Sequence, residues 1–138
     1  MKAHLQSVEK FTIFDIDGKL HYCRAIPEHQ GYYASTLGDI VSTRQNSPKI
    51  LKPDDNRSGY LRVILSVEGT TVRHYVHRLV AAAFFNSPDA DPNGNVRVQI
   101  NHIDSNRSNN RVSNLEWSSR SENMLHAFKM AEVRDAQI

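Results

Sequence analysis

The sequence predicts an α+β fold, in which antiparallel β-hairpins and one helix precede a strand–strand–helix unit. Three observations support this. Up to residue 76, short runs rich in β-branched and aromatic residues alternate with turn-forming residues. The alanine-rich run 77–85 then has a helical period. After residue 95, a strand pattern, a polar loop, a short strand and a second helical pattern follow in that order.

The N-terminal part predicts two short hairpins. Residues 11–16 alternate and then meet Asp17-Gly18, a strong two-residue turn signal, so that residues 20–25 form the return strand and Pro27 ends it. Residues 32–36 and 40–43 form a second pair around the turn at residues 37–39.

The middle of the chain predicts a loop, a hairpin and a helix. Residues 45–58 are polar, with a short extended piece at 49–51. Residues 60–66 and 70–76 flank a turn at 67–69 and give the clearest hairpin of the chain. The apolar face of the run 77–85 is expected to pack on this hairpin.

Residues 86–95 carry two prolines and a glycine and predict a linker. We therefore divide the chain into a β-rich region 1–86, a linker 87–95 and a unit 96–138. In that unit we expect a strand at 96–103, a polar loop at 104–113 and a strand at 115–118. A final helix, capped by Ser119 or Ser121, would run to about residue 134.

Composition narrows the class of protein. The chain has 138 residues, 39% hydrophobic and 23% charged, which is typical of a globular protein. No apolar run is long enough to cross a membrane, and residues 1–8 lack a secretory signal pattern. The single cysteine excludes an intramolecular disulfide, and scattered histidines give no zinc cluster. We expect a cytoplasmic protein without a membrane partner.

Charge is unevenly distributed. Residues 44–78 hold seven Lys/Arg and three acids, a net of +4, although the whole chain carries only +2. Residues 97–120 hold four Arg and two acids, a net of +2. This pattern is compatible with a surface that faces phosphates, and a solvated charged face would explain it too.

Three residues form the candidate site. His102 ends a predicted strand and can act as a general base. Asn114, twelve residues later, ends the polar loop, and its amide can pin that loop and fix the His102 ring in one tautomer. Asn123, nine residues further on, lies in the first helical turn, where its oxygen could bind a hard divalent ion. Asn101 supplies a second oxygen if the backbone turns there, whereas Asp104 fits either a ligand or a loop-bracing turn. Taken singly, each also fits an ordinary structural role.

These motifs resemble a known family. Residues 101–106, 109–117 and 121–123 are similar to the HNH nucleases with a ββα-metal fold, in particular to the phage HNH homing endonucleases. Residues 76–84 are similar to the helix that precedes the motif in that group. Residues 31–42, 50–53 and 59–63 resemble the DNA-binding module often fused at the N-terminus of these enzymes.

The resemblance implies a metal-dependent DNA endonuclease. His102 would deprotonate water for attack on a DNA phosphate, and Asn114 would hold the base and its loop. Asn101 and Asn123 would bind one divalent ion, Mg²⁺ by expectation with Mn²⁺ as the alternative. The family often has aspartate where Asn101 stands. It also often carries a C-terminal DNA-binding helix module, for which the chain up to Ile138 has no room.

Double-stranded DNA is the expected partner of a monomer or homodimer. The candidate DNA contacts are basic residues of the hairpin, the helix and the polar loop: Lys52, Arg57, Arg62, Arg73, Arg78, Arg107, Arg111 and Arg120. Two other functions stay open: a DNA-binding protein that has lost cleavage, and a nuclease directed at RNA.

Overall fold

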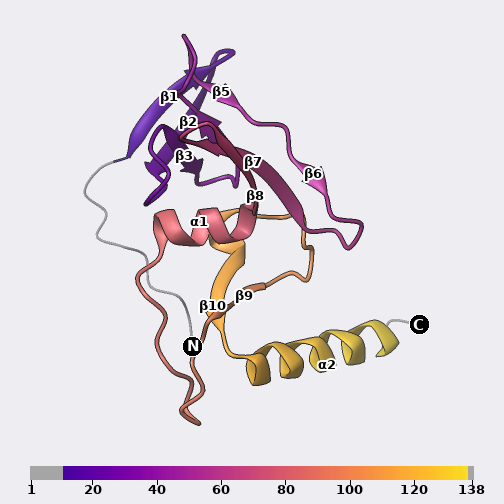
Figure 1. The fold of residues 1–138 in the computed structure, drawn as a ribbon. Coiled ribbons are helices and arrows are strands. Elements are labelled where there is room, and N and C mark those ends of the chain that lie inside the picture. The colour runs from indigo at the N-terminus through magenta and orange to yellow at the C-terminus, as the bar shows by residue number, and fades with distance from the viewer. Residues whose placement is uncertain (1–10, 137–138) are drawn as a thin grey trace.

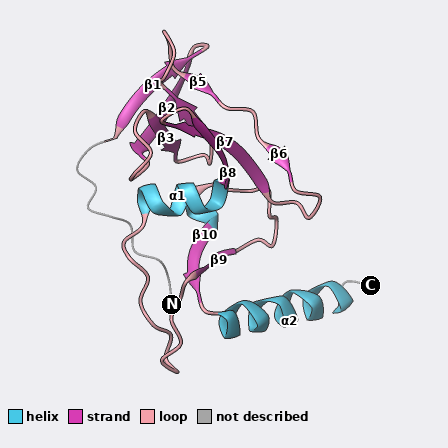
Figure 2. Ribbon diagram, in the orientation of Figure 1, coloured by secondary structure: helices cyan, strands magenta, loops and turns pink. Residues whose placement is uncertain are grey.

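The computed structural model describes residues 11–136, and its fold is α+β as the sequence predicted. The predicted region 1–86 begins, and the predicted unit 96–138 ends, outside the described residues. Residues 1–8, for which no secretory signal was expected, lie entirely outside them. In the described part, the strands form a five-stranded, a three-stranded and a two-stranded antiparallel sheet (Figures 1 and 2). No helix of this part is long and apolar enough to cross a membrane.

The five-stranded sheet has its strands in chain order. They are β1 (Thr12–Ile16), β2 (Lys19–Ala25), β3 (Tyr32–Ser35), β4 (Ile40–Ser42) and β5 (Lys49–Ile50). Asp17 and Gly18 both have positive φ, of 54° and 82°, as a two-residue hairpin turn requires. Both predicted N-terminal hairpins are thereby confirmed.

The three-stranded sheet contains β6 (Asp54–Asp55), β7 (Leu61–Val67) and β8 (Thr70–Tyr75). The hairpin of β7 and β8 was predicted. Residues 45–58 were predicted as a loop with a short extended piece at 49–51. The extended piece is confirmed by β5. The loop prediction was wrong at β6, because Asp54 pairs with Arg62 in the backbone ladder and also accepts a hydrogen bond from its side chain. That charged pair lets two acidic residues occupy an edge strand.

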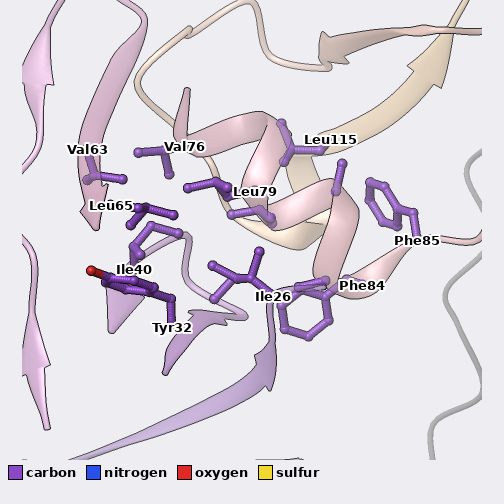
Figure 3. Packing of buried hydrophobic residues seen from close by; sticks show 14 residues of the cluster. Ile26, Tyr32, Ile40, Val63, Leu65, Val76, Leu79, Phe84, Phe85 and Leu115 are labelled. Atoms are coloured by element: carbon purple, nitrogen blue, oxygen red, sulfur yellow. The ribbon is translucent and has the colours of Figure 1, made fainter. Parts of the chain in front are cut away.

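Helix α1 (Val76–Phe84) lies at the centre of the molecule (Figure 1). Its side chains are buried except for Arg78 and Ala82, which are four residues apart and therefore share one face. Figure 3 shows Leu65, Ile40 and Tyr32 on one side of the helix and Leu115 on another. Since Leu115 belongs to the C-terminal hairpin, one hydrophobic core joins that hairpin to the N-terminal sheets.

The C-terminal unit comprises β9 (Gln99–His102), a 3₁₀ turn (Val112–Asn114), β10 (Leu115–Ser118) and α2 (Arg120–Ala136). The predicted strand 96–103 was too long. Val96 instead makes an isolated bridge with Ala90, and the Arg97 N–H donates to the Asp89 carbonyl at 2.9 Å. The chain therefore folds back on itself before β9 begins.

Candidate functional site

The site is built on β9, β10 and the first turn of α2. In the antiparallel pair, His102 lies opposite Leu115 and Asn101 opposite Glu116. Ser119 and Glu122 cap the helix reciprocally: the Ser119 N–H donates to Glu122 at 2.9 Å, and the Glu122 N–H donates to the Ser119 hydroxyl at 3.2 Å. This capping box confirms Ser119, one of the two predicted caps.

A second set of contacts fixes the start of α2. The buried Arg97 guanidinium donates to both carboxylate oxygens of Glu122, at 2.9 and 3.1 Å, and to Asp89 at 2.8 Å. Asp91 accepts a hydrogen bond from the Ser119 hydroxyl at 2.7 Å, which holds the pKa of Asp91 below its usual range. The segment that the sequence predicted as a linker is thus tied to the helix that carries Asn123.

One open cavity of about 580 Å³ brings together three of the predicted residues, Asn101, His102 and Asn123. Tyr60, Gln99 and Arg107 also line it, as does His126 from the next turn of α2. Asn114 does not line this cavity. The strand end and the helix start therefore face a common space, which is large enough for a phosphodiester group and its solvent.

His102 is buried, with 5% of its surface exposed. Burial is the main cause that lowers its pKa from 6.5, and Arg107 lowers it further, while Asn110 and Asp104 act in the opposite direction. A lowered pKa keeps the imidazole neutral near neutral pH. The ring is thus in the protonation state in which it can accept a proton.

The interpretation that the Asn114 amide fixes the His102 ring was wrong. The His102 Nε2 atom lies 2.8 Å from Oδ1 of Asn110, and among the residues that the structure describes Asn114 makes no hydrogen bond to the ring. The reason is that Asn114 directs its amide into the loop, where it accepts from the Asp104 N–H and donates to Asp104 Oδ1 and to the Asn109 carbonyl. Its predicted bracing of the loop agrees with these contacts.

Asp104 belongs to the same brace. Its carboxylate accepts the Asn106 N–H and the amide groups of Asn109 and Asn114, and the hydrogen bond from Asn109 is the largest cause that lowers its pKa. These contacts are those of the loop-bracing turn that the sequence offered as one of two alternatives for this residue.

Asn101 and Asn123 present a donor set that fits a hard cation. The Asn101 amide nitrogen donates to Glu116 at 3.1 Å, and the Asn123 amide nitrogen donates to Gln99 at 2.7 Å. Because a carboxylate only accepts hydrogen bonds, Glu116 fixes which end of the Asn101 amide is nitrogen. Asn123 Oδ1 also accepts the Ser118 hydroxyl at 2.7 Å and has a second lone pair. Among the described residues, no group of three or more His, Cys, Asp or Glu side chains could hold a metal.

The candidate DNA contacts have different surroundings. Arg107 lines the cavity, donates to the Ser58 carbonyl at 3.0 Å and lies 4.9 Å from the centre of the Tyr60 ring. Arg62 and Arg73 both pair with Asp54. Arg78 lines a neighbouring hollow of about 410 Å³ that shares Arg107 and Asn123 with the first. The remaining four are exposed: Lys52, Arg57, Arg111 and Arg120.

Sequence reasoning missed several residues of the site, chiefly Asn110, Gln99, Tyr60 and His126. His126 follows Asn123 by three residues, so helical spacing alone could have placed the two on one face. Asn110 stands inside the motif already recognised, but the sequence does not tell which of the loop asparagines reaches the histidine.

Comparison with known proteins identifies the class. A sequence model described as HNH endonuclease matches residues 74–125. The chain is 35% identical over 104 residues to an uncharacterized HNH endonuclease of Acanthamoeba polyphaga mimivirus, covering 75% of this chain and 29% of that protein. It is 31% identical over 100 residues to the DNA endonuclease I-HmuI of Bacillus phage SP01, covering 72% and 53%.

A solved structure, titled "DNA binding and cleavage by the HNH homing endonuclease I-HmuI", matches with a TM-score of 0.65 and 25% identity. The match covers 79% of this chain and 59% of that one. This chain belongs to the HNH endonuclease family. It spans less than two thirds of the length of the relatives that it matches.

Proposed function

We propose that this chain is a metal-dependent endonuclease that hydrolyses phosphodiester bonds of double-stranded DNA, of the homing type found in phages. The single observation that supports this most is the shared cavity, which holds His102, Asn101 and Asn123 together. A general base and two amide oxygens on one cavity wall suit the attack of water on a phosphate. Such an enzyme would act in the cytoplasm of the host cell, as a monomer or a homodimer.

We assign each residue of the site a role in phosphodiester hydrolysis. His102 takes a proton from the attacking water, and Asn114 keeps the loop that carries His102 in place. Asn101 and Asn123 would hold one divalent ion, with Mg²⁺ as the first choice and Mn²⁺ as the second. That ion, when bound, would polarise the phosphate and stabilise the charge on the leaving oxygen.

DNA would approach over the basic surface beside the cavity. We assign phosphate contacts to Arg107 and Arg78, because they line adjoining hollows that share Asn123. Arg62 and Arg73 lie on the same face of the β7–β8 hairpin. Arg73 is directly opposite Ile64, and Ile64 is on the same face as Arg62, two residues before it. Lys52, Arg57, Arg111 and Arg120 complete the proposed surface.

One observation favours a second function, DNA binding without cleavage. The acid that the family often has next to the catalytic histidine is replaced by Asn101, whose amide nitrogen is already bonded to Glu116. An all-amide site carries no charge of its own, and metal binding would depend on the phosphate.

Nicking of supercoiled plasmid separates the two functions. With Mg²⁺ we expect conversion to nicked circles, abolished by EDTA and strongly reduced by Asn123→Ala, whereas DNA affinity in the presence of EDTA stays the same. Parallel reactions with single-stranded DNA and RNA test the substrate class. DNA binding without any metal-stimulated cleavage of duplex DNA would contradict the endonuclease and support the second function.

A further inference from the structure

Within the described part of the chain, Asn110 alone forms a hydrogen bond with the His102 ring. Both side chains are buried, Asn110 with 3% and His102 with 5% of its surface exposed. The rings of His77 and Tyr60 also pack near His102, with centroids at 5.2 and 6.0 Å, and neither of these ring contacts is a hydrogen bond to a His102 nitrogen. Asn110 is therefore the residue whose hydrogen bond can orient the nitrogens of the imidazole.

We propose that Asn110 is the positioning residue of the catalytic base: it holds the proton of neutral His102 on Nε2 and leaves Nδ1 to take the proton from water. This inference rests on the proposed function of His102. An amide oxygen can only accept a hydrogen bond, so the nitrogen facing Asn110 Oδ1 must carry the proton. The lone pair of the neutral ring is then on Nδ1.

The position of Nδ1 agrees with this role. No hydrogen bond to Nδ1 is found among the described residues, and Nδ1 is not one of their buried polar atoms without a partner. His102 lines the cavity that contains Asn101 and Asn123. Nδ1 is thus the nitrogen that water in the cavity can reach.

The N-terminal sheet holds Asn110 in place. A Cβ on Gly38 would lie 2.6 Å from the backbone carbonyl of Asn110, so the β3–β4 turn packs directly against this residue. The Val112 N–H donates to the Thr36 carbonyl at 3.0 Å, two residues further along. Asn110 Nδ2 is buried and has no partner among the described residues, so packing and the hydrogen bond to the histidine hold this amide.

Nitrogen-15 NMR of imidazole-labelled protein tests the proposal without any cleavage reaction. At a pH where His102 is neutral, its two ring nitrogens have distinct shifts, and His102→Ala assigns them by loss of the signals. We expect the Nε2-protonated form in the wild type and in Asn110→Asp, which keeps an acceptor oxygen. Asn110→Leu should give a mixture of both tautomers. Asn106→Ala, in the same loop but away from the ring, should match the wild type.

Single-turnover cleavage of duplex DNA supplies the second readout. A ring that presents N–H to water cannot act as the base, so Asn110→Leu should cut about 10- to 100-fold more slowly, with DNA affinity within about threefold of the wild type. Wild-type His102 protonated on Nδ1, or Asn110→Leu with an unchanged tautomer, would overturn the proposal even if the enzyme cleaves DNA. If Asn110→Leu does not fold, the wild-type spectrum and Asn110→Asp still decide.

Discussion

At the residue scale, the proposed base His102 belongs to an aromatic cluster in which the two histidines are buried and the two tyrosines are more exposed. His77 stacks against His102, Tyr60 and Tyr75, with ring centroids between 5.2 and 5.5 Å for all three contacts. Burial lowers the pKa of His77 from 6.5 to about 4, and the neighbouring His102 and Arg78 contribute. Its Nδ1 has no hydrogen-bond partner within the described residues. The cluster therefore favours neutral imidazoles.

This burial predicts a loss of stability in mild acid. The unfolded chain binds a proton at His77 below pH 6.5, whereas the folded protein stays neutral there down to about pH 4. The contribution of neutral His77 to the free energy of unfolding is therefore fully present above pH 6.5. It falls as the pH falls, by on the order of 3 kcal/mol at pH 4. In urea unfolding, the free energy of unfolding of His77→Phe should therefore fall less steeply between pH 6.5 and 4 than that of the wild type. Parallel curves for the two proteins would exclude this origin.

Gly38 gives a second prediction at this scale. Its φ of +90° is unfavourable for other residues, and a Cβ would meet the backbone of Asn110. Gly38→Ala should cost about 3 kcal/mol of unfolding free energy and slow cleavage. Gly18 is the matched control, because its φ is +82° but nothing lies within 4 Å of its added Cβ. Gly18→Ala should cost about 1 kcal/mol and leave cleavage unchanged; equal effects at the two positions would contradict the contact.

The sequence led us to expect three residues in one site and a ring contact from Asn114; the three residues do line one cavity, but the ring contact comes from Asn110. Asn101, His102 and Asn123 share the cavity because their spacing matches a strand end and a first helical turn. The ring contact of Asn110 was missed because it depends on how the loop 103–111 bends, including the positive φ of 63° at Ser105. No spacing rule predicts such a bend in a loop rich in asparagine.

At the element scale, the start of α2 determines where Asn123 lies. Glu122 bonds Arg97 and caps the helix through the Ser119 N–H, and hydrogen bonding to Arg97 is the main cause that lowers the Glu122 pKa. The rest of α2 is more exposed, with Leu125 and Phe128 at 55% and 65%. The helix is held chiefly by its first turn.

Glu122→Ala tests this anchor. Loss of the cap and of the charged hydrogen bonds should cost on the order of 2 kcal/mol and reduce cleavage, because Asn123 would no longer be held against Gln99 and Ser118. Glu132→Ala, at an exposed position of the same helix, is the control and should change neither quantity. Unfolding curves and single-turnover rates provide the measurement. Full activity of Glu122→Ala would exclude a role for the anchor in the site.

Most elements could be predicted because local signals agree with the fold. The turn at Asp17-Gly18 and the alanine-rich run of α1 both formed as expected. The predictions failed at β6 and at residues 96–98, and in both places ion pairs hold the backbone. Asp54 is held by Arg62, and Arg97 by Asp89 and Glu122. Hydropathy and turn patterns do not show which charged residues pair, and Glu122 lies 25 residues from Arg97.

At the scale of the whole molecule, α1 joins the two halves, and two of the basic residues, Arg107 and Arg78, line the cavity and the hollow beside it. The packing of Leu115 against the core of α1 could not be predicted from periodicity, which shows an apolar face but not its partner. The charge distribution was visible in the sequence. The proposed phosphate binding, in contrast, depends on which basic side chains the fold brings together on the surface.

The phosphate surface predicts a steep dependence on salt. The DNA association constant, measured without divalent metal, should fall with rising salt with a log–log slope steeper than about −3 if several cations contact phosphates. Arg78→Gln should reduce the slope by about one. Lys19→Gln, at the distant β1–β2 turn, should leave it unchanged. A shallow slope in the wild type, or an equal change in both variants, would remove Arg78 from the DNA surface.

The most direct test of the account is the single-turnover rate of duplex cleavage, with saturating protein and Mg²⁺, for the wild type, His102→Ala and the control His74→Ala. His74 lies in β8 outside the cavity. We expect His102→Ala to lower the rate at least about 100-fold, with DNA affinity within about threefold, and His74→Ala to leave it unchanged. Cleavage by His102→Ala at the wild-type rate would contradict the assignment of this cavity as the catalytic centre.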